Sequence, residues 1–205
     1  MLLNPLSDMH KEEPGKPGYT AEGAEAAGQS NMIKLIGGTN LTVEDTINLW
    51  LLTERHRYHM LHPDLIQSGY NFNCDSKNCF SGLNVLQGLN SQNEVQNVVY
   101  PANNQVNVPP IRYPITWGFY IPWVSPLDDS KEVRFVSAAI YNENNQKISY
   151  SIKEPNHSDN ACDYFNQIIL TPKNDLLPNH TYRVEMTVSH QGQSYSKIWR
   201  FTTGP

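Results

Sequence analysis

The stretch "NLTVEDTINLWLLTERHRYHML", residues 40–61, carries the clearest helical pattern in the chain. Its apolar residues recur every three or four positions, and Thr42 with Asp45 forms a capping-box pattern at its start. Pro63 marks the exit, because proline cannot continue a helix. The segment therefore predicts one helix that begins near Thr42 and carries histidines in its C-terminal part.

Those histidines allow more than one interpretation. His56 and His59 are three residues apart, so a helix places both rings on one face, where they could share a metal ion with a third ligand. His62 is expected to lie past the helix end. In the alternative interpretation, His59 and His62 are solvated and act as cations at the helix C-terminus. His56 would then be a hydrogen-bonded packing residue on the stripe of Leu49 and Leu52.

The segments on either side of this helix contain weaker signals. Residues 20–36 are alanine-rich with an acidic first turn, but Gly23 and Gly28 weaken a helix there. The stretches "SGYNFN" and "CFSGLNVLQG" predict a short β-hairpin. Cys74 and Cys79 enclose four turn-prone residues, so a disulfide across the hairpin is possible, and two reduced cysteines in a loop are the alternative. Cys162 has no partner nearby in the sequence.

From Val98 onward the pattern is β. Seven strands are expected, spaced as in a β-sandwich, near "VNVPP", "TWGFYI", "VRFVSAAIYN", "KISYSIK", "NQIILTP", "TYRVEMTVSH" and "YSKIWRFTT". In "LLPNHTYRV" the order of Leu, Pro and Tyr predicts a tyrosine corner, in which the Tyr182 hydroxyl bonds to backbone near Leu177 or Pro178. An ordinary tyrosine at a strand start is the alternative.

The composition of the chain limits which kinds of partner it is expected to bind. The 205 residues carry a formal net charge of −5, 17% of them are charged, and no run of basic residues forms a patch. Nucleic acid is therefore not an expected partner. No apolar stretch is long enough for a membrane span, and the N-terminus lacks the basic start and apolar core of a secretory signal.

Two segments resemble the bacterial branch of the CAP superfamily (cysteine-rich secretory proteins, antigen 5 and pathogenesis-related proteins). One is "TVEDTINLWLLTERHRYHMLHPDLIQSGYNF", with Trp50 followed by the pair His56-Arg57. The other is "HKEEPGKPGYTAEGAEAAGQSNMI", in which His10 matches the first histidine of the family. The resemblance covers roughly residues 8–73. "YPANNQVNVPP" and the terminal "WRFTT" resemble the immunoglobulin-like domain that follows such modules.

The resemblance implies an α+β fold. A partial CAP-like α-β-α sandwich at 1–96 would lack the family's long first helix, as expected of a truncated chain, and its loss would expose apolar surface. An immunoglobulin-like β-sandwich would follow at 97–205. The family cleft is lined by two histidines, here His10 and His56, which could bind a divalent cation, and by two acids. Ser30-Asn31-Met32 offers no carboxylate where the family has one, so Glu13 and Glu54 are the candidates.

The resemblance further implies a secreted or cell-surface protein that binds a protein, a cell-wall component or a lipid-like ligand, without a firm enzymatic role. One alternative is a hydrolase, in which His10 and His56 act as base and metal- or water-positioning groups beside Glu13 or Glu54. Another is a purely structural or adhesive surface module.

Overall fold

A computed structural model describes residues 8–37, 41–90, 95–120, 132–155 and 165–205. The chain divides into two compact units, Met1–Ser91 and Gln92–Pro205. Strands make up 46% of the residues that the structure describes and helices 15%. The prediction of an α-β-α sandwich followed by an immunoglobulin-like domain is therefore wrong, because the described residues form a mostly β structure with three sheets.

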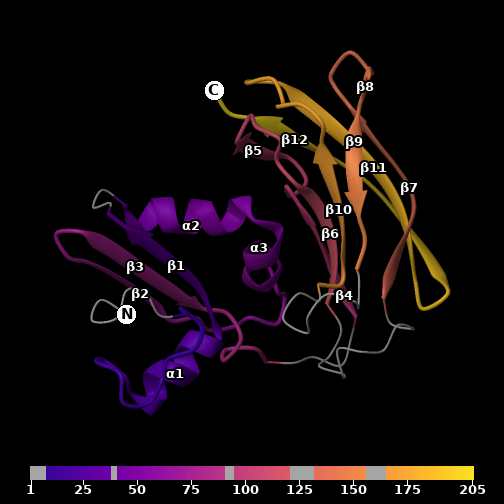
Figure 1. The fold of residues 1–205 in the computed structure, drawn as a ribbon. Coiled ribbons are helices and arrows are strands. Elements are labelled where there is room, and N and C mark those ends of the chain that lie inside the picture. The colour runs from indigo at the N-terminus through magenta and orange to yellow at the C-terminus, as the bar shows by residue number, and fades with distance from the viewer. Residues whose placement is uncertain (1–7, 38–40, 91–94, 121–131, 156–164) are drawn as a thin grey trace. The chain divides into compact units, whose positions relative to one another are not determined.

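The first unit contains a three-stranded antiparallel sheet in the order β1-β3-β2 (Figure 1). Its strands are β1 (Ser30–Ile36), β2 (Tyr70–Cys74) and β3 (Asn78–Asn84), and its helices are α1 (Ala21–Gly28), α2 (Val43–Leu52) and α3 (Glu54–Met60). Each of these helices has only seven to ten residues, so the described part of the unit has no helix of the length from which an α-β-α sandwich is built. Apolar side chains at the end of β1 and on α2 are exposed, namely Leu35, Ile36, Val43 and Leu49.

The predicted helix at 42–61 forms as two helices. The capping box is present, because Thr42 and Asp45 bond to each other's backbone at the start of α2. At Thr53 the backbone is extended, with φ of −100° and ψ of 125°, and this residue separates α2 from α3. Threonine favours such a break because its hydroxyl competes for backbone carbonyls, and the Thr53 hydroxyl donates to the Trp50 carbonyl at 3.1 Å.

The segment at 20–36 is also not one element. Its helix ends at Gly28, and β1 begins at Ser30. The "IKLI" run of β1 pairs with β3, so sheet formation decides the conformation of this segment.

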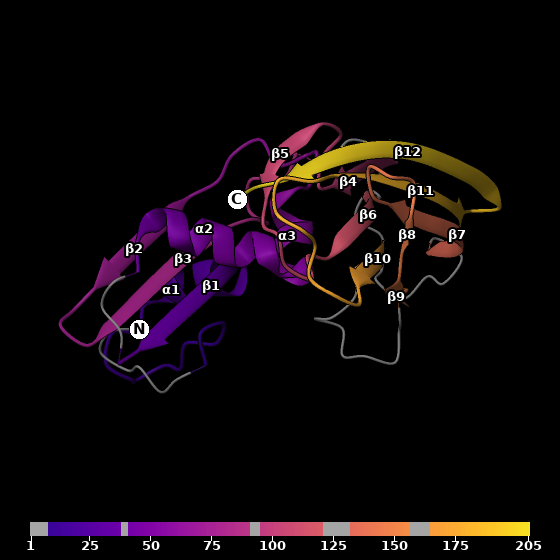
Figure 2. The same ribbon diagram turned by 90° about the horizontal axis from the view of Figure 1, so that it is seen from above.

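The second unit contains two sheets, in the orders β4-β6-β10-β9 and β5-β12-β11-β7-β8. Figure 2 shows the same strands from above. The strands are β4 (Gln96–Tyr100), β5 (Gln105–Val108), β6 (Ile115–Tyr120), β7 (Val133–Tyr141), β8 (Lys147–Ile148), β9 (Tyr150–Lys153), β10 (Gln167–Pro172), β11 (Thr181–His190) and β12 (Gln193–Thr203). The short strand β5 runs parallel to β12, whereas the other pairings are antiparallel.

The core of the second unit lies between its two sheets. Along β11, residues alternate between buried and half-buried, as the sequence pattern predicts. The rings of Trp117 on β6 and Trp199 on β12 meet with their centroids 6.5 Å apart. Strand spacing indicated these strands, but such spacing is common to many β folds, and so it led to the wrong immunoglobulin-like assignment.

Tyr182, near the start of β11, is part of this core. Its side chain is 2% exposed and stacks on Phe201, with the ring centroids 5.6 Å apart. The backbone N–H of Leu177 donates to the Tyr182 hydroxyl at 2.8 Å, which is the contact expected of a tyrosine corner. Burial raises the pKa of the phenol, and Glu143 raises it further, whereas the bond from Leu177 lowers it.

Candidate functional site

The break at Thr53 positions His56 on the first turn of α3. The Thr53 hydroxyl lies 2.7 Å from Nδ1 of His56. Because this hydroxyl donates to the Trp50 carbonyl, it accepts from the N–H of His56. The side-chain amide of buried Asn31 donates to the His56 carbonyl at 2.9 Å. Hydrogen bonds to its ring and to its backbone carbonyl therefore fix the position of His56.

The pKa of His56 is lowered, first by partial burial and then by the neighbouring positive charges of His10 and Arg55, while Glu54 opposes the shift. His56 is consequently neutral at pH 7. Since its Nδ1–H is engaged by Thr53, the Nε2 lone pair is the one available for bonding.

His59 on α3 and His62, two residues past its end, are half-buried rather than solvated. Burial lowers the pKa of His59 to about 4, with further contributions from His62 and His56. Burial also lowers the pKa of His62, against the opposing charge of Asp64. Burial disfavours the charged form, which speaks against the interpretation in which both act as cations at the helix C-terminus.

The sequence-predicted site residues come together only in part. His10 is exposed, and its Nδ1 lies 3.1 Å from the Ala27 carbonyl. It is near enough to His56 for its charge to affect the pKa of that ring. Glu13 is exposed, and Glu54 acts on His56 electrostatically. Within the described residues, no group of three or more His, Cys, Asp and Glu side chains could hold a metal ion.

Two further residues of the segment that resembles CAP proteins, Trp50 and Arg57, have structural roles. Trp50 is fully buried, and its ring meets Tyr70 edge-on with centroids 6.4 Å apart. Arg57 is 1% exposed and donates from Nη1 to the Leu51 carbonyl at 2.8 Å. Trp50 therefore packs α2 against β2, and Arg57 ties α3, which carries His56 and His59, to the backbone of α2.

A cleft of about 980 Å³ lies in the first unit, and neither His10 nor His56 lines it. It is bounded by α1, by the three strands and by the loops around residues 67–69 and 87–88. Gly88 allows these loops to meet, because a Cβ there would lie 1.8 Å from the Gln67 carbonyl oxygen. The loops are joined by a hydrogen bond of 3.1 Å from the Ile66 N–H to the Gly88 carbonyl.

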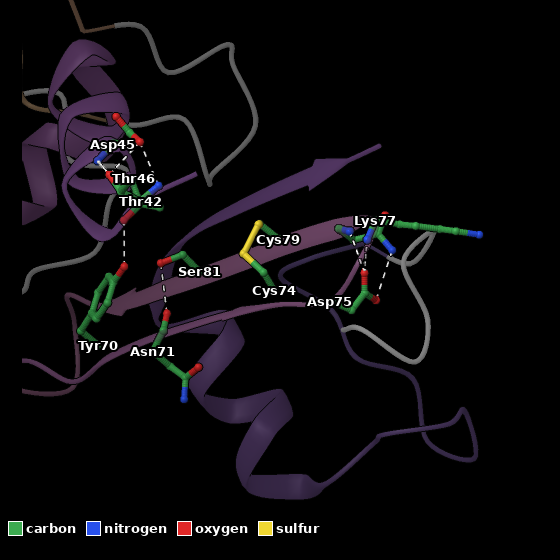
Figure 3. The surroundings of a disulfide bond; sticks show 11 residues. Thr42, Asp45, Thr46, Tyr70, Asn71, Cys74, Asp75, Lys77, Cys79 and Ser81 are labelled. Atoms are coloured by element: carbon green, nitrogen blue, oxygen red, sulfur yellow. Dashed lines mark hydrogen bonds between the residues drawn. A yellow bond between two sulfur atoms is a disulfide. The ribbon is translucent and has the colours of Figure 1, made fainter. Parts of the chain in front are cut away.

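Nine of the nineteen residues that line the cleft are glycine, alanine, methionine or phenylalanine, and nine others have neutral polar side chains. The amides among them are Gln67, Asn71, Asn73, Asn84 and Gln87. Figure 3 shows that the Tyr70 ring and the Asn71 side chain leave β2 on opposite faces, with the Tyr70 hydroxyl reaching Thr46 of α2 at 2.9 Å. The lining includes a single charged residue, Glu12, which the sequence analysis did not select. Its only sequence signal is its place beside Glu13, two residues after His10.

One wall of the cleft is held by the disulfide Cys74–Cys79, which joins directly opposed residues of β2 and β3 (Figure 3). The turn between them is closed by Asp75, whose Oδ1 accepts from the backbone N–H groups of Lys77 and Asn78. These bonds lower the pKa of the Asp75 carboxyl. The third cysteine, Cys162, lies outside the described residues.

No protein-family model matches the chain, and no curated protein is similar to it in sequence. In the part of the chain that the structure describes, no helix has the length and apolarity to cross a membrane.

Proposed function

We propose that the chain is a binding protein whose first unit holds an uncharged, hydrogen-bonding ligand in the cleft between α1 and the sheet. The lining of the cleft carries this proposal. Its amide side chains can donate and accept, its serine hydroxyls can still accept, and its single charge is the Glu12 carboxylate. Ligand sites in proteins are concave and orient their ligands with a few polar groups, and this cleft has that composition.

We further propose that the protein works outside the cell or at its surface. The disulfide Cys74–Cys79 supports this location, because disulfides persist in oxidising compartments. The resemblance of residues 8–73 to CAP proteins supports both the location and a binding role.

The geometry supports a hydrolase less well. Neutral His56 has the lone pair that a general base needs. However, His56 and His10 do not line the cleft, where a substrate of useful size would bind. A purely adhesive module would need no such cleft.

The experiment is a thermal-shift and calorimetry screen of the intact chain against two sets of uncharged probes, soluble hexasaccharides and hexapeptides. A variant that fills the cleft, Asn71→Trp, is compared with Asn48→Trp, an exposed residue of α2 that does not line it. Asparagine and tryptophan have similar helix propensities, so the control change should fold normally.

We expect at least one probe to raise the melting temperature of the parent and of Asn48→Trp, because a ligand that binds only the folded state stabilises it. Asn71→Trp should lose this shift. Equal binding by Asn71→Trp and the parent, or turnover of a probe that depends on His56, would contradict the proposal.

A further inference from the structure

The lining of the cleft limits the class of ligand that it can bind, provided that the proposed binding function holds. We propose that the ligand is a neutral oligosaccharide and that Glu12 determines specificity by accepting hydrogen bonds from its hydroxyl groups.

The lining can pair with a ligand chiefly through side-chain amides, which Gln67, Asn71 and Asn73 supply. The serines of the lining already donate to backbone carbonyls, and the Asn84 amide bonds to Gln87. Each amide both donates and accepts, and so does each hydroxyl of a sugar. A ligand that carries several hydroxyls can therefore pair with these amides, whereas a small amine could donate to them but could not accept from them.

The charge of the lining also favours a neutral ligand. Among the lining residues, which all lie in the described part of the chain, there is no Lys or Arg, and Glu12 is the sole acid. An anionic ligand would meet no opposite charge there. Hydrogen bonds to a carboxylate are stronger than those between neutral groups, so Glu12 can contribute more to binding than any other single side chain of the wall.

The position of Glu12 indicates that a ligand supplies its hydrogen-bond donor. Its Oε2 is buried and makes no hydrogen bond to any described residue. The first turn of α1 leaves room for this oxygen because residue 23 is glycine, and a Cβ there would lie 3.0 Å from Oε2. A buried carboxylate oxygen without a donor is costly. A donor supplied by a ligand would remove that cost.

Size agrees with an oligosaccharide rather than a single sugar. Pockets for small molecules usually measure about 300–1,000 Å³, and this cleft reaches about 980 Å³. Its lining extends along β3 from Phe80 to Asn84, which gives it the length of several strand residues.

The test uses the intact chain and four neutral hexasaccharides: cellohexaose, N-acetylchitohexaose, xylohexaose and mannohexaose. Calorimetry compares the parent with Glu12→Gln and with the matched control Glu13→Gln, an exposed neighbour that does not line the cleft. Glu12→Gln keeps the shape of the side chain and removes the charge. The melting temperature of the ligand-free variant checks its fold.

We expect one hexasaccharide to bind the parent and Glu13→Gln equally, and to bind Glu12→Gln about tenfold to a hundredfold more weakly. Equal affinity for Glu12→Gln overturns the role of Glu12. Binding of hexapeptides without any hexasaccharide overturns the ligand class but leaves the binding function standing. Saccharide binding that survives Asn71→Trp overturns the cleft as the site, and with it the proposed function.

Discussion

His59 should make the first unit less stable in mild acid. Its folded-state pKa of about 4 lies below its ordinary value of 6.5. The unfolded chain therefore binds more protons between these values, and stability present above about pH 6.5 is lost as the pH falls toward about 4. For a single site with these two pKa values, lowering the pH from about 7.5 to about 5 costs about 2 kcal/mol of unfolding free energy.

The variant His59→Gln removes this titration. Urea unfolding at both pH values should show that the parent loses about 2 kcal/mol more stability than the variant. The unfolding free energy of the variant at pH 7.5 reports any packing lost by the substitution itself. His56 and His62, whose pKa values are also lowered, contribute to the acid sensitivity of both proteins.

A titration of the His59 ring by NMR provides the direct check. The reasoning is wrong if the ring titrates near its ordinary pKa, or if parent and variant show the same dependence of stability on pH.

Three further variants test the structural residues. Tyr182→Phe should lower the unfolding free energy of the second unit by about 1–3 kcal/mol, because the Leu177 N–H loses its acceptor; an unchanged melting curve would refute the corner. Replacing Cys74 and Cys79 by serine should cost about 2 kcal/mol in the chain-entropy treatment of so short a loop, measured by urea unfolding; unaltered stability would show that the hairpin does not need the bond. Thr42→Ala should cost about 1 kcal/mol through loss of the α2 cap, and hydrogen exchange in α2 that matches the parent would argue against it.

Features set by neighbouring residues were predictable from the sequence. The α2 cap depends on residues three positions apart, and the Tyr182 contact spans five positions. The opposition of Cys74 and Cys79 follows from the four-residue turn between them. In each case the two partners are held together by the same short piece of backbone, so little depends on the rest of the fold.

Features set by distant residues were not predictable. The Ala-rich segment continues into β1 because β3, some fifty residues later, offers it a partner. The order of strands in the second unit depends on pairings such as that of β5 with β12, which local patterns do not encode. Strand propensity indicates that a segment is extended but not which strand it joins.

The cleft could likewise not be predicted from local sequence patterns. The resemblance to CAP proteins drew attention to His10 and His56, whereas the cleft forms where α1, the sheet and two loops meet. Glu12 stands in an irregular segment with no periodic pattern, and its position over Gly23 exists only in the folded chain. The burial that lowers the pKa of His59 likewise arises from tertiary packing and not from helical spacing.

The central claim is that the cleft of the first unit binds a neutral ligand. NMR of the ¹⁵N-labelled chain, titrated with the four hexasaccharides, tests it most directly, because side-chain amides have their own signals. We predict that the amide signals of Asn71, Asn73 and Asn84 shift on binding while that of Asn48 on α2 does not. Shifts confined to the α3 histidines or to the second unit, or no shift with any hexasaccharide or hexapeptide, would contradict the account.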